Sequence, residues 1–275
     1  MPVAQQAPNL LDLEYFEASD AGRTRDHNED YSGHTAPAPE AEGRTHGWLF
    51  ALADGVGGEE RGEVASQTAI ETLLAGFRAA PASEAHAPLL GRLIQTANTK
   101  IYELGRAASP GGSRMATTIV AATLRYDRMT VAHVGDSRCY LIRDGIASQI
   151  TRDHTVVADQ QRLGLLTPQE AATAETRHIL SRSLGSDLFV NIDTDERQLQ
   201  PGDTVLLCTD GLHGPVNESE LAGTLARYPQ LETAAARLIA LANEKDGGDN
   251  VSVQLIRVRA VERTGMYRGR PYTLR

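Results

Sequence analysis

The chain has 275 residues, 41% of them hydrophobic, and a net charge of −9 at pH 7. The length allows one large domain or two small ones, while the negative charge and the scattered Lys and Arg argue against nucleic acid or anionic membrane as a partner. No apolar run reaches the roughly 18 residues of a membrane span, and the first residues lack a signal-peptide pattern. We therefore expect a cytoplasmic protein without a membrane partner.

The two cysteines, Cys139 and Cys208, both lie in apolar, strand-like runs. Two cysteines give no disulfide framework, so we interpret them as small core residues in a reducing compartment.

The N-terminal part begins with a polar tail, residues 1–12, and a first strand at 13–19. Residues 33–46 carry Pro, Gly and His without periodicity, and we expect them to form a surface connection.

The polar segment 20–30 follows the first strand and contains the adjacent acids Glu29 and Asp30, with Arg25 upstream. A solvated loop is the default for so charged a run. However, acids can hold metals, and a guanidinium group offers a planar fork to a phosphate or carboxylate.

An unbroken apolar run begins at Trp48 and ends at Asp54, and glycines follow it at positions 55, 57 and 58. Because an unpaired buried charge is very costly, Asp54 is expected where this strand emerges from the core. A carboxylate beside exposed backbone suits a hard cation such as Mg²⁺ or Mn²⁺. Taken alone, a strand followed by an Asp-Gly turn is the simpler interpretation.

The same design recurs in the chain, which favours the metal interpretation. Apolar runs end at Asp136 and at Asp210, and Asp249 precedes a last apolar segment. If these strands lie side by side, the carboxylates collect at one edge and repel one another unless cations neutralise them. The cluster is therefore a metal site, or the strands do not share an edge.

Helical periodicity appears in four segments. The first follows Gly58 and runs to about Arg78, and the others are at 88–105, 217–226 and 230–244. The remaining strands are expected at 116–124, 129–134, 139–143, 146–150, 204–208 and 251–256, with Asp144-Gly145 as a hairpin turn. Residues 259–275 form a basic C-terminal tail, expected to be a frayed end.

Residues 151–188 are polar and contain several arginines, and a helix is predicted to begin at Thr167-Pro168. We interpret this segment as a flap over the site, with a plain connector as the equal alternative. The following residues 191–195 faintly resemble a calcium loop but lack its glycine and glutamate, so we dismiss that interpretation.

The helices and strands do not alternate regularly, which argues against a doubly wound parallel sheet. The order fits an α+β fold, a four-layer α-β-β-α sandwich of two antiparallel sheets flanked by helices, with the metal site at the sheet edge.

Six motifs together resemble those of the metal-dependent serine/threonine phosphatases of type 2C, most closely the compact bacterial branch. They occur in the order Asp20-x-Gly-x-x-Arg-x-x-Asn-Glu-Asp30, Ala53-Asp-Gly-x-Gly-Gly58, Met115-Ala-Thr-Thr118, Val134-Gly-Asp-Ser-Arg138, Thr209-Asp-Gly-Leu212 and Asp249-Asn250. The resemblance covers residues 13–258 and implies a single phosphatase domain of the fold inferred above.

The resemblance implies hydrolysis of phosphoserine and phosphothreonine in proteins, in opposition to a serine/threonine kinase, with two core Mn²⁺ or Mg²⁺ ions and a weaker third. Carried over by position, Asp54, Asp210 and Asp249 hold the first ion. Glu29, Asp54 and the Gly55 carbonyl hold the second, and Asp136 belongs to the third. Asp30 orients the metal-bound water, Arg25 grips the phosphate, and the protein is expected to act as a monomer.

Three positions depart from the family pattern. Val56 stands where some members have a histidine proposed as general acid, so the leaving oxygen is expected to take its proton from metal-bound water. Ala116 replaces a glycine, which is a mild packing change. Gly214 replaces a further acid of the third metal site, which weakens that assignment.

Two other phosphate chemistries are excluded by the sequence. A cysteine phosphatase needs Cys-x₅-Arg, but Gly145 and Gly214 stand where that arginine would follow Cys139 and Cys208, and no P-loop motif is present. The remaining alternative is a catalytically silent module of the same fold that binds or senses phosphoproteins. The presence of all the core acids favours the enzyme.

Overall fold

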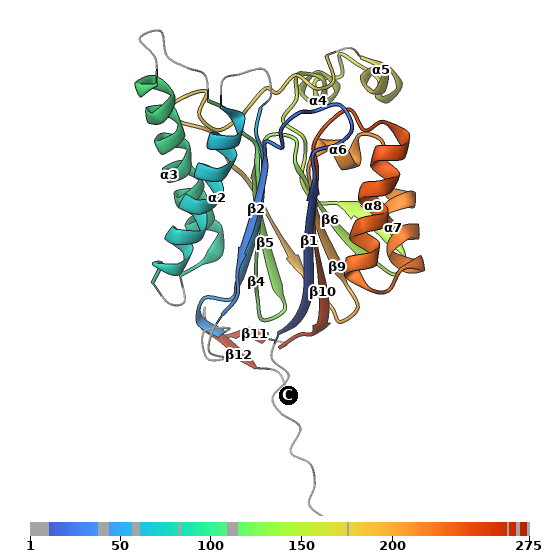
Figure 1. The fold of residues 1–275 in the computed structure, drawn as a ribbon. Helices are drawn as coiled ribbons and strands as arrows, with labels where there is room; N and C mark the ends of the chain where they lie inside the picture. The colour runs from blue at the N-terminus through green and yellow to red at the C-terminus, as the bar shows by residue number, and fades with distance from the viewer. Residues whose placement is uncertain are drawn as a thin grey trace, which may run out of the picture.

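Two antiparallel five-stranded sheets pack face to face, and helices cover both outer faces (Figure 1). The computed structural model describes residues 11–37, 44–56, 61–81, 84–108, 115–174, 176–262, 264–267 and 270–273. The first sheet has the order β1 (Asp12–Asp20), β10 (Val251–Ala260), β9 (Thr204–Cys208), β6 (Arg138–Arg143) and β7 (Ile146–Gln149). The second has the order β2 (Asp30–Thr35), β3 (Trp48–Asp54), β4 (Ile119–Arg125), β5 (Arg128–Val134) and β8 (Asp193–Gln198).

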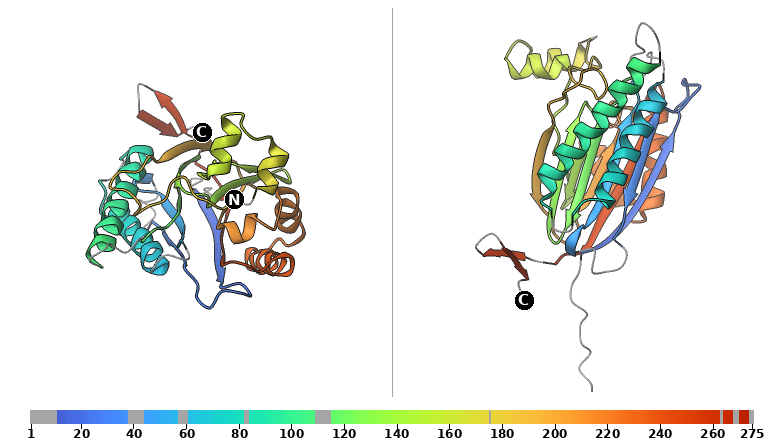
Figure 2. Two further views of the ribbon diagram at one scale, coloured as in Figure 1. Left: turned by 90° about the horizontal axis from the view of Figure 1, so that it is seen from above. Right: turned by 90° about the vertical axis from the view of Figure 1, so that its left-hand side faces the viewer.

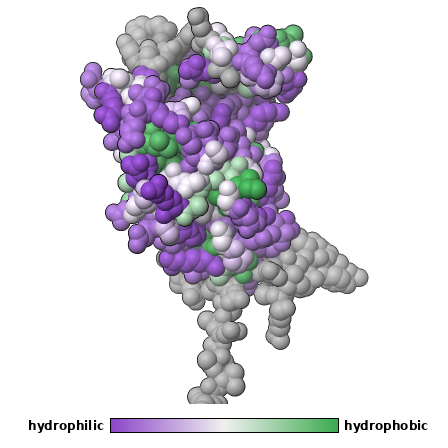
Figure 3. Space-filling view, turned by 90° about the vertical axis from the view of Figure 1, so that its right-hand side faces the viewer, coloured by the Kyte–Doolittle hydropathy of each residue, from purple (hydrophilic) through white to green (hydrophobic). Residues whose placement is uncertain are grey.

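Each sheet carries its own pair of long helices. Helices α2 (Gly62–Arg78) and α3 (His86–Ala107) cover the second sheet. Helices α7 (Glu218–Arg227) and α8 (Leu231–Lys245) cover the first, and the surface on their side of the molecule is largely hydrophilic (Figure 3). The amphipathic helices thus separate a buried apolar stripe from a solvated face.

Alternation along the strands builds three apolar layers. In β3, Leu49 and Ala51 face the helices α2 and α3, whereas Phe50 and Leu52 face the other sheet. Side chains at successive strand positions point to opposite faces, so a strand that is apolar throughout serves both layers at once. This explains why the central strands appear in the sequence as continuous apolar runs.

The predicted four-layer α-β-β-α fold is confirmed, including the turn at Asp144-Gly145, where both residues have positive φ angles. The capping box of Thr167 and Glu170 begins α5 (Pro168–Thr173), as predicted. The two cysteines are buried and unpaired. No helix in the described ranges is both long and apolar enough to cross a membrane.

Two expectations from the sequence are wrong, and one strand was not predicted. Residues 33–46 are not only a connection, because β2 occupies Asp30–Thr35, and the unpredicted strand β8 begins at Asp193. Both are edge strands with partly exposed polar side chains, which gave no apolar run to recognise. The expected frayed end contains the small hairpin of β11 (Thr264–Tyr267) and β12 (Arg270–Thr273).

The segment between β7 and β8 lies over one end of the sandwich and carries α4 (Val156–Arg162) and α5, as two views show (Figures 1 and 2). The β11–β12 hairpin lies at the opposite end. We keep the name flap for residues 151–188.

Candidate metal centre

The ends of strands from both sheets meet at the flap end of the sandwich. Asp54 ends β3, Asp136 follows β5, Asp210 begins the short helix α6 (Asp210–His213) after β9, and Asp249 precedes β10. All four line one cleft of about 760 Å³, together with Arg25, Glu29 and Gly55. The strands therefore share an edge, and the alternative that they do not is excluded.

The loop before β2 reaches this cleft because it lies against the turn before β10. The Arg23 backbone N–H donates to the Gly247 carbonyl at 2.9 Å, and Gly22 has φ +78°. A Cβ atom at position 22 would lie 2.2 Å from the Asp249 carbonyl oxygen, so only glycine allows this approach. Arg25 then forms an ion pair with Asp249, with Nη2 2.9 Å from Oδ2.

Two threonines fix the backbone of Asp54. The Asp54 N–H donates to Thr118 Oγ1 at 3.0 Å, while the Asp54 carbonyl accepts from the Thr118 N–H at 2.8 Å and from Thr117 Oγ1 at 2.6 Å. Across the β2–β3 ladder, Asp30 pairs with Asp54. The two acids are therefore held on neighbouring strands whatever their charge.

Asp30 lies behind the cleft rather than in its wall, and its Oδ2 accepts from Thr209 Oγ1 at 3.0 Å. Glu29 is held through its backbone, because its N–H donates to Asn250 Oδ1 at 2.9 Å. Sequence reasoning gave no roles to Thr117, Thr118, Thr209 and Asn250. Their position directly beside the acids in the motifs was the available signal.

Burial and mutual repulsion raise the pKa values of several acids in this cluster. Burial, and then the charges of Asp30 and Asp210, raise the pKa of Asp54 well above its usual value. Burial and the Asp210 charge raise the pKa of Asp136 to about 8. Burial raises the pKa of Asp30 to about 7, although hydrogen bonds from Ser252 and Thr209 oppose the shift. Such shifts report carboxylates that are unstable as anions without a compensating positive charge.

The donor set fits divalent cations. Asp30 Oδ1 and Asp210 Oδ1 are buried and have no hydrogen-bond partner among the described residues. Carboxylate and carbonyl oxygens, which Asp54, Asp210 and Gly55 offer, are the ligands that Mg²⁺ and Mn²⁺ prefer.

The cleft acids nevertheless stand apart from one another. Within the described ranges, the only set of three His, Cys, Asp or Glu residues with donor atoms all within 4.8 Å is His133, His154 and Asp193, at the base of the flap. A centre for two ions spreads its ligands more widely, because each ion takes only some of them.

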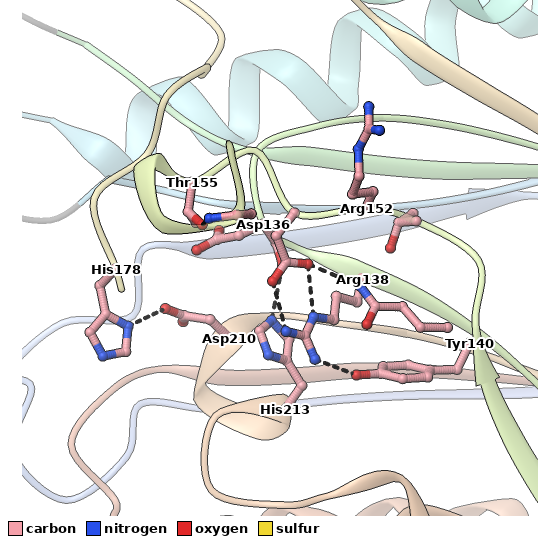
Figure 4. Close-up of polar contacts among 12 residues, drawn as sticks. Asp136, Arg138, Tyr140, Arg152, Thr155, His178, Asp210 and His213 are labelled. Atoms are coloured by element: carbon pink, nitrogen blue, oxygen red, sulfur yellow. Dashed lines mark hydrogen bonds and ion pairs between the residues drawn. The ribbon is translucent and has the colours of Figure 1, made fainter. Parts of the chain in front are cut away.

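The flap supplies a wall of the cleft through Arg177, His178 and Leu180. His178 is turned toward Asp210, with Nδ1 3.9 Å from Oδ2, and His213 donates from Nε2 to the Asp136 carbonyl at 2.9 Å (Figure 4). One flap side chain, His178, thus lies beside an acid of the cleft.

The three departures from the family pattern all lie at this site. Val56 and Gly214 line the cleft, and Ala116 is buried, with its carbonyl accepting from the Val56 N–H at 3.0 Å. Gly57 and Gly58 of the second motif lie outside the described residues.

Comparisons with known proteins agree with this arrangement. Residues 25–249 match the family model of Protein phosphatase 2C. The Serine/threonine phosphatase stp of Listeria innocua is 34% identical over 255 residues, which are 92% of this chain and 96% of the relative. The Serine/threonine protein phosphatase PstP of Mycobacterium tuberculosis is 36% identical over 88% of this chain and 44% of its own length.

Solved structures show the same fold. The serine/threonine phosphatase of S. agalactiae superposes with a TM-score of 0.82 at 32% identity, covering 90% of this chain and all of that one. The catalytic domain of PstP in complex with two manganese ions superposes with a TM-score of 0.75 at 35% identity, covering 90% and 98%.

The raised pKa of Asp30 gives a prediction for the protein in EDTA. The folded state keeps a proton that the unfolded chain releases near pH 4, so the Asp30 contribution destabilises the fold as pH rises from about 4 to about 7. The Asp30→Asn variant has no such titration. The difference in free energy of unfolding, variant minus wild type, should therefore increase by about 2–4 kcal/mol between pH 4 and pH 7. Urea denaturation at several pH values measures it. A pH-independent difference would contradict the electrostatic description.

Proposed function

The chain belongs to the protein phosphatase 2C family and is a metal-dependent serine/threonine protein phosphatase, and we propose that it opposes a serine/threonine kinase by direct attack of water on the phosphoprotein. The single observation that supports this best is the convergence of Glu29, Asp54, Asp210 and Asp249 with Arg25 in one open cleft. The cleft offers no cysteine, since both cysteines are buried elsewhere, so a phosphocysteine intermediate is excluded.

We propose that the acids share two core cations. Asp54, Asp210 and Asp249 would hold one, and Glu29, Asp54 and the Gly55 carbonyl the other, with Asp136 offering a ligand for a weaker third. When bound, such ions lower the pKa of a shared water and stabilise charge on the phosphoryl group. Asp54 stands in both sets, and its fixed backbone suits a bridging ligand.

The remaining residues act on the substrate and the water. Arg25 is about 43% exposed at the cleft, so its guanidinium can meet phosphate oxygens with paired hydrogen bonds. Asp30 Oδ1, which has no donor among the described residues, can accept a hydrogen bond from the attacking water and hold it in line. Val56 cannot donate a proton, so the leaving oxygen takes its proton from water in the cleft.

The silent binding module, which was the alternative from the sequence, would differ from the enzyme in one respect that is easy to test. Both would bind Mn²⁺, but only the enzyme turns over. Hydrolysis of p-nitrophenyl phosphate and of a phosphothreonine peptide that depends on Mn²⁺ supports the proposal, and the absence of turnover in both assays would rule it out.

Asp210→Asn should lower kcat by about a thousandfold or more, because it removes a charged ligand while keeping the side-chain shape. Circular dichroism should show the fold retained. The matched control is Asp144→Asn in the β6–β7 turn, whose positive φ asparagine tolerates, and it should keep full activity. Equal activity in the two variants would refute the ligand assignment.

Arg25→Ala should mainly weaken phosphate binding, raising KM by about tenfold or more with a smaller fall in kcat. The product inhibition constant of inorganic phosphate should rise in parallel. Arg92→Ala, which removes an exposed arginine of α3 paired with Glu84, is the control. An unaltered KM and kcat in Arg25→Ala would remove Arg25 from the site.

A further inference from the structure

The two ends of the flap meet on one carboxylate. Asp193 begins β8, and its Oδ2 accepts from Arg152 Nη2 at 3.0 Å while its Oδ1 accepts from Arg182 Nη1 at 2.9 Å. In the sheet, Asp193 pairs with His133 on β5. The segment between the two arginines is therefore closed into a loop at the edge of the second sheet.

His154 stands at the centre of this closure. Its ring is almost fully buried and stacks on the His133 ring, with centroids 4.6 Å apart, while His133 Nε2 donates to the Arg152 carbonyl at 2.8 Å. His154 Nε2 lies 3.5 Å from Asp193 Oδ2 and has no hydrogen-bond partner within the described part of the chain.

His154 also makes a two-point contact with the turn that carries Asp136. Its backbone N–H donates to the Gly135 carbonyl at 3.0 Å, and the Gly135 N–H donates to its ring Nδ1 at 3.2 Å. Gly135 has φ +103°, and a Cβ atom there would lie 2.6 Å from the Thr118 side chain. Because Thr118 in turn binds Asp54, the contact of His154 with Gly135 leads directly to the acid cluster.

On its other side, the backbone of His154 and Thr155 holds the segment of the flap that lines the cleft. The Ser181 N–H donates to the His154 carbonyl at 2.9 Å, and Thr155 pairs with Leu180. Leu180, His178 and Arg177 are the flap residues that line the cleft. His154 thus connects the flap wall, through its backbone carbonyl, to the Gly135 turn of the metal centre, through its backbone N–H and its ring.

We propose that His154 is a positioning residue, which fixes the flap at a set distance from the Gly135–Asp136 turn and so holds the flap wall over the cleft for a phosphoprotein substrate. The inference rests on the proposed function only for the identity of that substrate.

A cation held by His133, His154 and Asp193 is the competing interpretation, and the hydrogen bonds disfavour it. His154 Nδ1 accepts a hydrogen bond from the Gly135 N–H. The neutral ring therefore carries its proton on Nε2 and offers no lone pair there to a cation. Burial, and then the nearby His133 and Arg182, lower the pKa of His154 to about 4, which agrees with a neutral ring. Both oxygens of Asp193 are already engaged by guanidinium groups.

The test compares His154→Leu with His154→Asn, whose Oδ1 can take the place of the Nδ1 acceptor. The control is His86→Leu, which removes another buried histidine, bonded to the His46 carbonyl outside the cleft. Amide hydrogen exchange on the full chain should be at least about tenfold faster across 155–181 in His154→Leu, near wild type in His154→Asn, and unchanged there in His86→Leu.

Kinetics provide the second measurement. In His154→Leu, KM for a phosphothreonine peptide should rise by about tenfold, while kcat at saturating Mn²⁺ changes by less than about threefold. Exchange that is unchanged in His154→Leu, or equally fast in His86→Leu, would overturn the proposal, as would a lower kcat without a change in KM. Wild type without turnover would refute the proposed function and leave the exchange result standing.

Zinc ions test the competing interpretation. With Mn²⁺ present, Zn²⁺ is expected to leave the Tm of wild type and of His133→Leu equally unaffected. A Zn²⁺-dependent rise in the Tm of wild type that His133→Leu abolishes would assign the cluster to a cation and overturn the positioning role.

Discussion

Repulsion between buried carboxylates is the constraint on which this structure depends. Asp54, Asp136 and Asp210 lie at strand ends from two different sheets. The charge of Asp210 raises the pKa of both Asp54 and Asp136, and the charge of Asp136 also raises that of Asp54. Unpaired carboxylates in so buried a place cost several kcal/mol, and no folding advantage explains them. In the metal centre proposed above, divalent cations would neutralise the cluster, and such cations, when bound, would also lower the pKa of a water that attacks phosphorus.

The sandwich is the means by which this cost is confined to one rim. Between the sheets, strands such as β3 are apolar on both faces, and that core holds the strand ends in place without help from the acids. The pairing of Asp30 with Asp54 between β2 and β3, and the hydrogen bond of Thr118 to the Asp54 backbone, then fix the positions of these two acids. Stability and function therefore occupy different parts of the same strands, which is common where strained groups serve a reaction.

The flap completes the site from the opposite side of the rim. Arg152 and Arg182 close its ends on Asp193, and His154 joins it to Gly135, one residue before Asp136. Ordering a loop of this length costs conformational entropy, which the contacts that hold it must offset. The several contacts at its base contribute to that offset and hold the part of the flap in which Arg177 and His178 line the cleft.

The central strands and their terminal acids could be predicted because the signal is local. An apolar run that stops at a carboxylate identifies both the strand and the place where it leaves the core, as at Asp54 and Asp210. The edge strands β2 and β8 could not be recognised in this way, because their polar sequences become strands only through pairing with a neighbour.

The base of the flap could not be predicted at all, because its parts are far apart in the chain. His133, His154 and Asp193 come together only when β5 and β8 pair, and each alone is an ordinary polar residue. The ordered motifs predicted which acids share the site, but not that Asp30 lies behind the cleft or that Arg25 pairs with Asp249.

The central claim is that cations replace protons among these acids. Calorimetric titration of Mn²⁺ into the metal-free protein at pH 7, in two buffers of different ionisation enthalpy, measures ions bound and protons released together. With the pKa of Asp30 at about 7 and that of Asp136 at about 8, we expect at least two ions to bind with net release of protons. Binding without proton release, or no binding at all, would contradict the account.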